Sequence, residues 1–275
     1  MSQRRATGLL SILDDFMAFT AWPMEKPKAY GPFHLIFFFV GLAVSIFFAW
    51  RLRNLDDKGH RRLLVGAGLF LLITELYKQL FYFCYIGNNT YQWWIFPFQL
   101  CSVPMYLCLI APNLKNKAIA RGMYNFMVYF NLLGGFIAFL EPSGLVHEYL
   151  TLTLHAFCWH MMLVFVGLYL AFSRRAGETM KDYFAAVLTF LALAAVAFII
   201  NLVFRKVSNG SINMFFVGPS NSSLIVFKDI AKNCGWYVST LAYLPTVSLG
   251  ALAVFGLVHL AGTIRNRRSG NPKKL

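Results

Sequence analysis

The sequence has few charged residues: they make up only 13% of its 275 positions, while hydrophobic residues make up 58% and aromatic residues 17%. So little charge excludes an ordinary soluble globular domain and is typical of an integral membrane protein. No stretch is polar enough to form a separate soluble domain or a long linker. Internal repeats of the kind found in many transporters are also missing.

Cysteine is scarce as well. The five cysteines show no metal-ligand spacing, so we expect no metal site and no cofactor. Asp14 and Asp15 interrupt the first apolar stretch, so we expect no secretory signal there. The apolar residues around these two acids instead predict an amphipathic helix at the membrane surface, within an N-terminal interfacial segment over residues 1–31.

Seven apolar runs are long enough to cross a hydrocarbon core of about 30 Å as helices of roughly 20 residues. The predicted fold class is therefore all-α, a polytopic membrane bundle of seven transmembrane helices within residues 32–263. Residues 205–236 form a long connection whose apolar pieces predict an outer lid or re-entrant cap. The seven runs are Phe33–Trp50, Leu63–Ile86, Trp93–Ala111, Gly122–Leu140, Glu148–Phe172, Tyr183–Phe204 and Tyr237–Ala261.

Basic residues outnumber acidic ones, 25 to 11, for a formal net charge of +14. They gather in alternate connections between the runs and in a basic tail over residues 264–275, whereas residues 87–92 and 141–147 contain no Lys or Arg. The positive-inside rule then predicts a cytoplasmic C-terminus and an outside N-terminus in the cell membrane. This pattern is an orientation signal, so we expect no nucleic-acid partner. The basic residues that it places outside weaken the prediction without reversing it: Arg4, Arg5, Lys26, Lys28, Arg205, Lys206, Lys228 and Lys232.

Polar side chains recur inside the apolar runs, where an ionisable or amide group is costly. Counting about 1.5 Å of rise for each helical residue places them at a similar depth in the outer half of the membrane. Polar groups at one depth on several helices imply a polar cavity inside the bundle. The residues are Glu75, Lys78, Gln79, Gln99, Cys101, Asn131 and His155.

Glu75, Lys78 and Gln79 are spaced i, i+3 and i+4, so they share one face of a helix. Glu75 and Lys78 can form a buried ion pair, which reduces the cost of both charges. Such a pair either fixes the packing of the helices or takes part in the chemistry. The spacing is compatible with both interpretations.

The third run begins unusually, because Pro97 and Pro104 each remove a backbone donor and predict a kinked or broken helix. Cys101 lies between them. A buried cysteine is commonly a small packing residue, but a thiolate beside a histidine base is an established acyl-transfer nucleophile. His155 lies at nearly the depth of Cys101. His160, the alternative base, lies about 140° around the same helix.

Two amides are candidates to support such a nucleophile by stabilising an oxyanion. Gln99 is two residues before Cys101, and Asn131 lies one turn before the Gly134-Gly135 pair, which permits close helix approach. Either amide can donate a hydrogen bond to a developing negative charge. The alternative role of Asn131 is a hydrogen bond between helices.

The segment Phe96–Ser102, Phe-Pro-Phe-Gln-Leu-Cys-Ser, resembles the bacterial YwaF-like family, which is related to the eukaryotic transmembrane protein 164 family. The similarity continues through Leu132–Pro142 and the run that contains His155, and it returns at Asn213–Pro219. It covers most of the bundle, from about the second run to the seventh.

This resemblance implies a membrane acyltransferase that acts on phospholipids with a catalytic Cys and a catalytic His. On the matching positions these are Cys101 and His155, with His160 as a competing base. Bacterial relatives often carry His where this chain has Gln99, so the sequence departs from the family pattern there.

The leading hypothesis is therefore a lipid acyltransferase that forms a thioester on Cys101, with a membrane phospholipid as substrate. One alternative is a transporter for a small solute or proton, in which Glu75, Lys78 and His155 are the coupling groups. The apparent sealing of the inner halves of the runs by Leu, Phe and Val argues against transport. A structural membrane protein without small-molecule chemistry is the other alternative.

Overall fold

The computed structural model describes residues 9–220 and 222–268, and within these ranges the protein is built from helices without a β-strand. Six helices are long and apolar enough to cross a membrane. The α-helices are α1 (Leu9–Thr20), α2 (Pro32–Arg51), α3 (Asp57–Leu80), α4 (Val103–Ile110), α5 (Lys117–Leu140), α6 (Leu150–Phe172), α7 (Met180–Phe204), α8 (Phe227–Cys234) and α9 (Trp236–Arg268). A π-helical extension of α3 over Phe81–Ile86 completes its apolar length.

The third predicted run is not a continuous helix, so the structure has six long helices where seven were expected. A single 3₁₀ turn over Trp93–Ile95 is followed by irregular chain, and only the eight residues of α4 are α-helical. Pro97 lies in the irregular part, where no helical donor is required. Pro104 lies in the first turn of α4, where a missing N–H costs nothing. The prolines therefore break this run and do not merely kink it.

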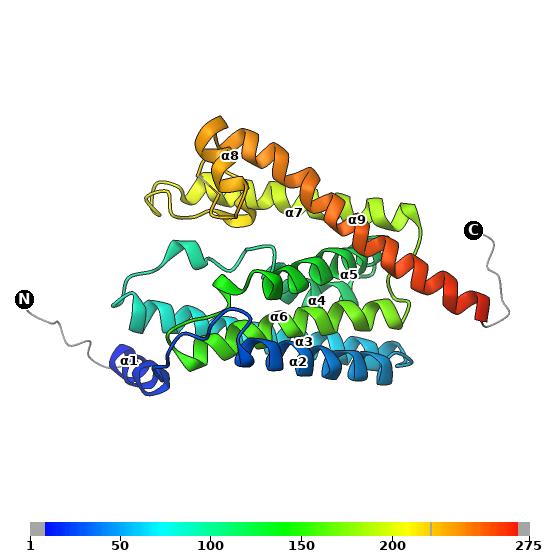
Figure 1. The fold of residues 1–275 in the computed structure, drawn as a ribbon, viewed down its shortest axis with the longest axis horizontal. Coiled ribbons are helices and arrows are strands. Elements are labelled where there is room, and N and C mark those ends of the chain that lie inside the picture. The colour runs from blue at the N-terminus through cyan, green and yellow to red at the C-terminus, as the bar shows by residue number, and fades with distance from the viewer. Residues whose placement is uncertain (1–8, 221, 269–275) are drawn as a thin grey trace, which may run out of the picture.

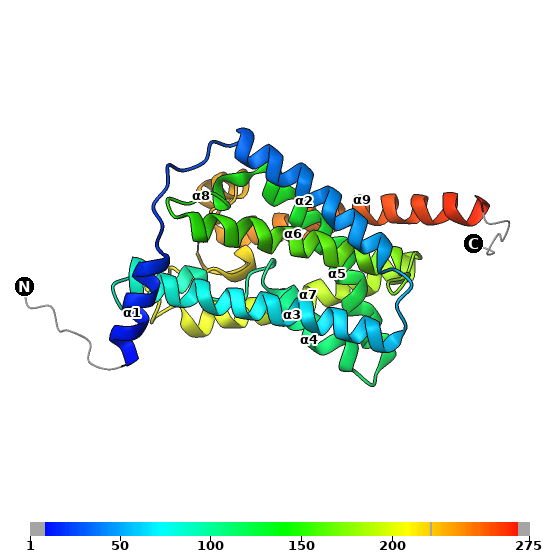
Figure 2. The ribbon, with the colours of Figure 1, turned by 90° about the horizontal axis from the view of Figure 1, so that it is seen from below.

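The long helices run roughly along one axis of the molecule, and α5 lies between two groups of helices (Figure 1). It packs against α6 on one side and against α7 and α9 on the other, while α2 packs on α6. The first described helix and the C-terminal end of α9 lie at opposite ends of the bundle. In Figure 2 α1 lies across the bundle axis at one end, and its position at a membrane surface stays a prediction.

Small residues let α5 and α6 approach closely. A Cβ atom on Gly135 would lie 2.7 Å from Val164 Cγ2, and one on Gly167 would lie 2.7 Å from Leu132 Cγ. Gly134 has no atom within 4 Å of its Cβ position. Of the Gly134-Gly135 pair, Gly135 alone makes the close helix contact that the sequence predicts.

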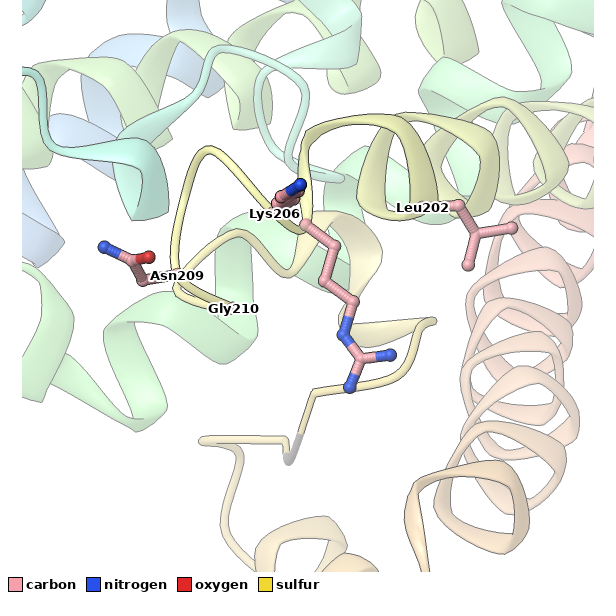
Figure 3. Close-up of a pocket in the computed structure, with 5 residues that line it drawn as sticks. Leu202, Lys206, Asn209 and Gly210 are labelled. Carbon is pink, nitrogen blue, oxygen red and sulfur yellow. The ribbon is translucent and has the colours of Figure 1, made fainter.

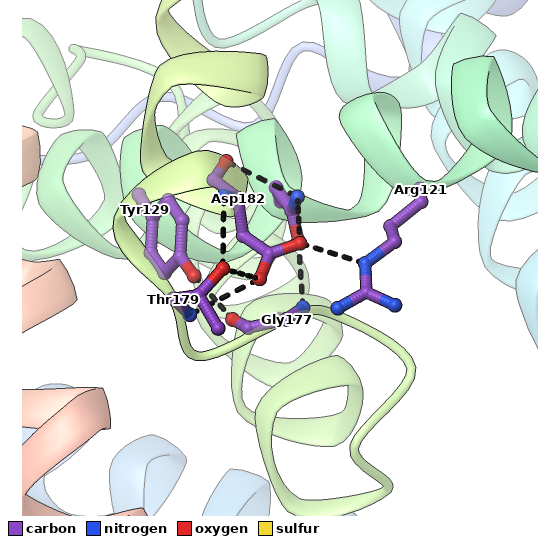
Figure 4. Close-up of polar contacts among 6 residues, drawn as sticks. Arg121, Tyr129, Gly177, Thr179 and Asp182 are labelled. Carbon is purple, nitrogen blue, oxygen red and sulfur yellow. Dashed lines mark hydrogen bonds and ion pairs between the residues drawn. The ribbon is translucent and has the colours of Figure 1, made fainter. Parts of the chain in front are cut away.

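A buried polar clamp joins α5 to the start of α7 at the opposite end of the bundle from α1 (Figure 4). Asp182 Oδ1 accepts from Arg121 Nε at 2.7 Å, and Asp182 Oδ2 accepts from the Thr179 hydroxyl at 2.6 Å. Thr179 and Asp182 form a capping box for α7. Asn125 Oδ1 accepts from Gly177 N–H at 2.8 Å, and the Tyr129 hydroxyl donates to the Gly177 carbonyl. The clamp fixes the α6–α7 connection to the centre of the bundle.

Candidate functional site

The polar stripe predicted on α3 forms a connected network. Lys78 Nζ lies 2.9 Å from both carboxylate oxygens of Glu75. Gln79 Nε2 donates to Glu75 Oε1 at 2.6 Å and to the Ile95 carbonyl at 2.7 Å. The Tyr91 hydroxyl donates to Gln79 Oε1 at 3.0 Å. The buried carboxylate of Glu75 therefore has both a cation and a hydrogen-bond donor as partners, as a buried charge requires.

Tyr91 precedes the irregular segment, and its surroundings keep its hydroxyl protonated. Burial, together with the nearby charge of Glu75, raises the pKa of Tyr91 to about 12. The phenol therefore remains a donor to Gln79 at any physiological pH. This contact ties the connection after α3 back to the α3 stripe.

Side chains from other helices satisfy the backbone of the irregular segment over residues 96–102. The Tyr106 hydroxyl donates to the Pro97 carbonyl at 2.8 Å, and Trp159 Nε1 donates to the Cys101 carbonyl at 3.0 Å. Irregular backbone at membrane depth is tolerated where such partners replace the missing helical bonds. Side chains of α4 and α6 thus hold the segment that carries Cys101.

Gln99 holds the long loop that follows α7. Its Oε1 accepts from Phe215 N–H at 3.1 Å, and its Nε2 donates to the Asn213 carbonyl at 3.3 Å. Asn201 on α7 holds the same loop by accepting from Met214 N–H at 2.6 Å and donating to the Met214 carbonyl at 2.9 Å. Both ends of the Gln99 amide are thus engaged, so its role as an oxyanion donor stays a prediction.

The loop held by these amides enters the core. Ile212, Met214, Phe215 and Val217 are almost completely buried and belong to the main apolar cluster of the bundle. Phe215 and Phe216 have positive φ angles of 55°, a strained conformation for bulky residues. Such strain persists where the surroundings hold the backbone in place, which the Gln99 and Asn201 contacts do here.

The predicted nucleophile and base both contact Trp159. The contact of Cys101 is made by its backbone, and that of His155 by its ring. Cys101 packs in a cluster that contains Trp159, which donates to its carbonyl. The His155 ring stacks on the Trp159 ring with centroids 5.5 Å apart. Lys78 Nζ lies 5.9 Å from the Trp159 ring centroid. Trp159 therefore joins three of the predicted site residues, which come from two helices and the irregular segment.

The His155 ring has one nitrogen free of protein partners. Its Nε2 is buried without a hydrogen bond within the described part of the chain. A neutral imidazole has one nitrogen that accepts a hydrogen bond, and Nε2 can fill this role toward a ligand or a proton donor.

His160 has a different environment from His155. Its Nδ1 lies 2.8 Å from the Ala156 carbonyl of its own helix. The same turn of α6 faces α5, because the His160 carbonyl lies 3.5 Å from the Cβ position of Gly135. Between the Cys101 thiol and either histidine there is no hydrogen bond among residues 9–220 and 222–268. The choice of base therefore rests on Trp159, which stacks on His155.

Asn131 lies on α5 with only 3% of its surface exposed. Its Nδ2 is buried and has no hydrogen-bond partner in the part of the chain that the structure describes. A buried amide donor left without a partner is costly. Asn131 is therefore a candidate to bind a ligand oxygen. The polar cavity that the sequence implies stays a prediction.

Trp159 is the residue that the sequence analysis missed. It is four residues after His155, which places the two side chains on one face of α6. An indole N–H at membrane depth also needs an acceptor, and broken backbone nearby is a source of acceptors. These two signals could have identified Trp159, but its acceptor became evident only with the helices assembled.

No group of three or more His, Cys, Asp and Glu side chains with metal-binding geometry occurs among the described residues. Neither the curated proteins nor the solved structures give a match to the chain. A model of the TMEM164 family matches residues 29–257. This match spans α2 to most of α9 and includes every predicted site residue, and the chain therefore belongs to the TMEM164 family.

Proposed function

We propose that the protein transfers an acyl chain between membrane phospholipids through a thioester on Cys101, with His155 as the base. The observation that carries the proposal is the position of Trp159, whose N–H holds the Cys101 carbonyl and whose ring stacks on His155. An indole that bonds to the backbone of the nucleophile and stacks on the ring of the base restricts the positions of both, as acyl transfer requires.

The first half-reaction forms the acyl-enzyme. His155 Nε2 takes the proton of the Cys101 thiol, and the thiolate attacks the ester carbonyl of a donor phospholipid. The tetrahedral intermediate collapses to the Cys101 thioester, and the departing lysophospholipid oxygen takes the proton from His155. In the second half-reaction, the hydroxyl of an acceptor lysophospholipid loses its proton to His155 and attacks the thioester. The C–S bond then breaks, and the released Cys101 thiolate takes the proton from His155, which restores the thiol.

Asn131 is the better supported of the two oxyanion candidates. Its buried Nδ2 lacks a partner, whereas both ends of the Gln99 amide bond to the loop after α7. A donor that is unsatisfied without substrate and satisfied by a developing oxyanion stabilises the transition state selectively. Gln99 then serves to fix the segment that carries Cys101.

The buried loop over residues 212–217 supports a lipid substrate that enters sideways between helices. The apolar side chains of this loop fill the core beside the Cys101 segment. An acyl-enzyme needs protection from water, because hydrolysis of a thioester ends the transfer. We assign this protection to the loop.

The acyl-enzyme provides a direct test. Purified protein is incubated with a defined phosphatidylcholine, and its intact mass is measured before and after hydroxylamine. We expect one hydroxylamine-labile acyl group on the wild-type protein and on Cys158→Ser, which removes an exposed thiol of α6. The group should be absent from Cys101→Ala. His155→Ala should slow its formation by a factor of about 10²–10⁴, the range for loss of a general base.

Failure of the proposal has a clear signature. An unacylated wild-type protein, together with identical membrane lipid profiles in strains that carry Cys101→Ala or His155→Ala, contradicts acyl transfer. Equal loss in His160→Ala and retention in His155→Ala would move the base to His160.

We also propose that the end of the bundle that bears α1 faces outward in the cell membrane and that the basic tail is cytoplasmic. The irregular chain with α4 would then be a seventh crossing. The proposed orientation is supported by the basic connections, which alternate with loops that lack Lys and Arg. In a cysteine-free variant, a membrane-impermeant maleimide should label Ser143→Cys on intact cells and Lys58→Cys only after lysis. The opposite labelling pattern would reverse the orientation.

A further inference from the structure

A basic pocket lies at the end of α7, and none of its residues takes part in the proposed acyl transfer. The pocket, of about 550 Å³, is lined by Leu202, Arg205, Lys206, Asn209 and Gly210. Figure 3 shows Lys206 and Asn209 on the turn that follows α7 and Leu202 on the helix before it. The lining contains two cations and no acid, so the pocket has a net positive charge.

The two cations are free to bind a ligand. Within the described residues, neither Arg205 nor Lys206 forms an ion pair, and neither side chain donates a hydrogen bond. Asn209 likewise makes no side-chain hydrogen bond to another described residue, while its own N–H donates to the Lys206 carbonyl at 3.2 Å. The polar groups that line the pocket are therefore available to a ligand.

The exposed face of α7 fixes the depth of this pocket relative to a membrane. Large apolar side chains are exposed along the helix from Met180, at 47%, to Val203, at 66%, and Val207 is exposed after it. Met180 and Val203 are 23 positions apart, about 35 Å along a helix, which is enough to cross a hydrocarbon core of about 30 Å. Arg205 and Lys206 follow immediately, at the level of lipid phosphates.

We propose that this pocket binds the headgroup of an anionic phospholipid, with Arg205 and Lys206 on the phosphate and Leu202 against the upper acyl chain. Arginine and lysine are the common partners of phosphate in proteins. A zwitterionic headgroup would place its ammonium beside two cations without an acid to balance it, so lipids with net negative charge are favoured. The proposal does not depend on acyl transfer.

The test titrates the full-length chain in detergent with phosphatidylglycerol and counts bound lipid by native mass spectrometry. A basic residue near a membrane surface changes affinity for anionic lipid by a factor of about five. We therefore expect the double variant R205Q/K206Q to bind phosphatidylglycerol about 25-fold more weakly. The matched control K228Q/K232Q removes two exposed lysines of α8 and should change the affinity less than twofold.

Three outcomes would overturn the proposal. They are equal weakening in both double variants, equally tight binding of phosphatidylcholine by the wild-type chain, and complete competition by millimolar inorganic phosphate. The last outcome would identify a free-anion site. Thermal unfolding of each variant in the same detergent checks that the fold is retained.

Discussion

At the scale of single residues, Trp159 does more for the candidate site than any residue that the sequence singled out. Its N–H satisfies a carbonyl that the broken third run leaves without a helical partner, and its ring positions His155. The indole therefore couples the stability of the Cys101 segment to the geometry of the base. A residue with both roles should be sensitive to a conservative change.

Trp159→Phe tests this coupling. Phenylalanine keeps an aromatic ring but leaves the Cys101 carbonyl unpaired, which should cost about 1–3 kcal/mol of unfolding free energy. Maleimide labelling of Cys101 should also accelerate, because its segment loses a fixed contact. Trp94→Phe is the control, since Trp94 is half exposed. Equal effects of the two changes on unfolding and labelling would exclude the role given to Trp159.

His147 predicts a pH dependence of stability. Burial lowers the pKa of His147, and the charges of Lys26 and Lys78 lower it further. In the unfolded chain His147 has its ordinary pKa of about 6.5 and takes up a proton below that pH, whereas in the folded chain it stays neutral to lower pH. The free energy of unfolding should therefore fall as the pH drops below about 6.5. His147→Gln should reduce this acid-induced decrease. Unfolding temperatures of the wild-type protein and of His147→Gln, measured from pH 7.5 to 5, test this prediction. Parallel curves for the two proteins would show that His147 does not cause the pH dependence.

At the scale of elements, the connection between α6 and α7 shows how a glycine can determine where a helix begins. A Cβ atom on Gly177 would lie 1.9 Å from Asp182 Cγ, inside the carboxylate that caps α7 and binds Arg121. A side chain at this position must displace the clamp. Gly134, in the interior of α5, has open space at the corresponding position.

Gly177→Ala and Gly134→Ala form a matched pair. The first should lower the unfolding free energy by about 2 kcal/mol or more, since it disrupts a helix cap and the hydrogen bonds of a buried carboxylate. The second should raise it by up to about 1 kcal/mol, because alanine is the better helix former. Chemical or thermal unfolding in one detergent measures both. Similar values for the two variants would show that the clamp contributes little.

At the scale of the whole molecule, two amides connect the loop after α7 to both halves of the bundle. Gln99 reaches it from the Cys101 segment and Asn201 reaches it from α7. The loop and the candidate nucleophile therefore belong to one hydrogen-bonded unit. Release of the loop at one amide should loosen the segment held by the other.

Asn201→Ala should leave the buried N–H of Met214 and the carbonyl of Val217 without their Asn201 partner, at a cost of about 1–3 kcal/mol for each group. Hydrogen exchange should increase over residues 212–217 and also over residues 96–102. Asn233→Ala, at an exposed position of α8, is the control and should change neither segment. Faster exchange confined to residues 212–217 would show that the two segments are not coupled.

The sequence by itself determined the properties that depend on local composition and spacing. Apolar length identified the six long helices, and the i, i+3, i+4 spacing placed Glu75, Lys78 and Gln79 on one helix face, where Glu75 contacts the other two. Two prolines indicated a disturbed third run, but its replacement by irregular chain was not predicted. The Phe-Pro-Phe-Gln-Leu-Cys-Ser segment indicated the family that the match over residues 29–257 shows.

Only the tertiary structure decided which polar groups meet. The bond from Trp159 to the Cys101 carbonyl, the two contacts of Gln99 and the unpaired state of Asn131 Nδ2 depend on how each helix is rotated about its axis. Depth along a helix can be counted from the sequence, but rotation is set by packing against neighbouring helices, such as the close contact at Gly135. The position of each polar group along its helix can therefore be read from the sequence, whereas the contacts between these groups cannot.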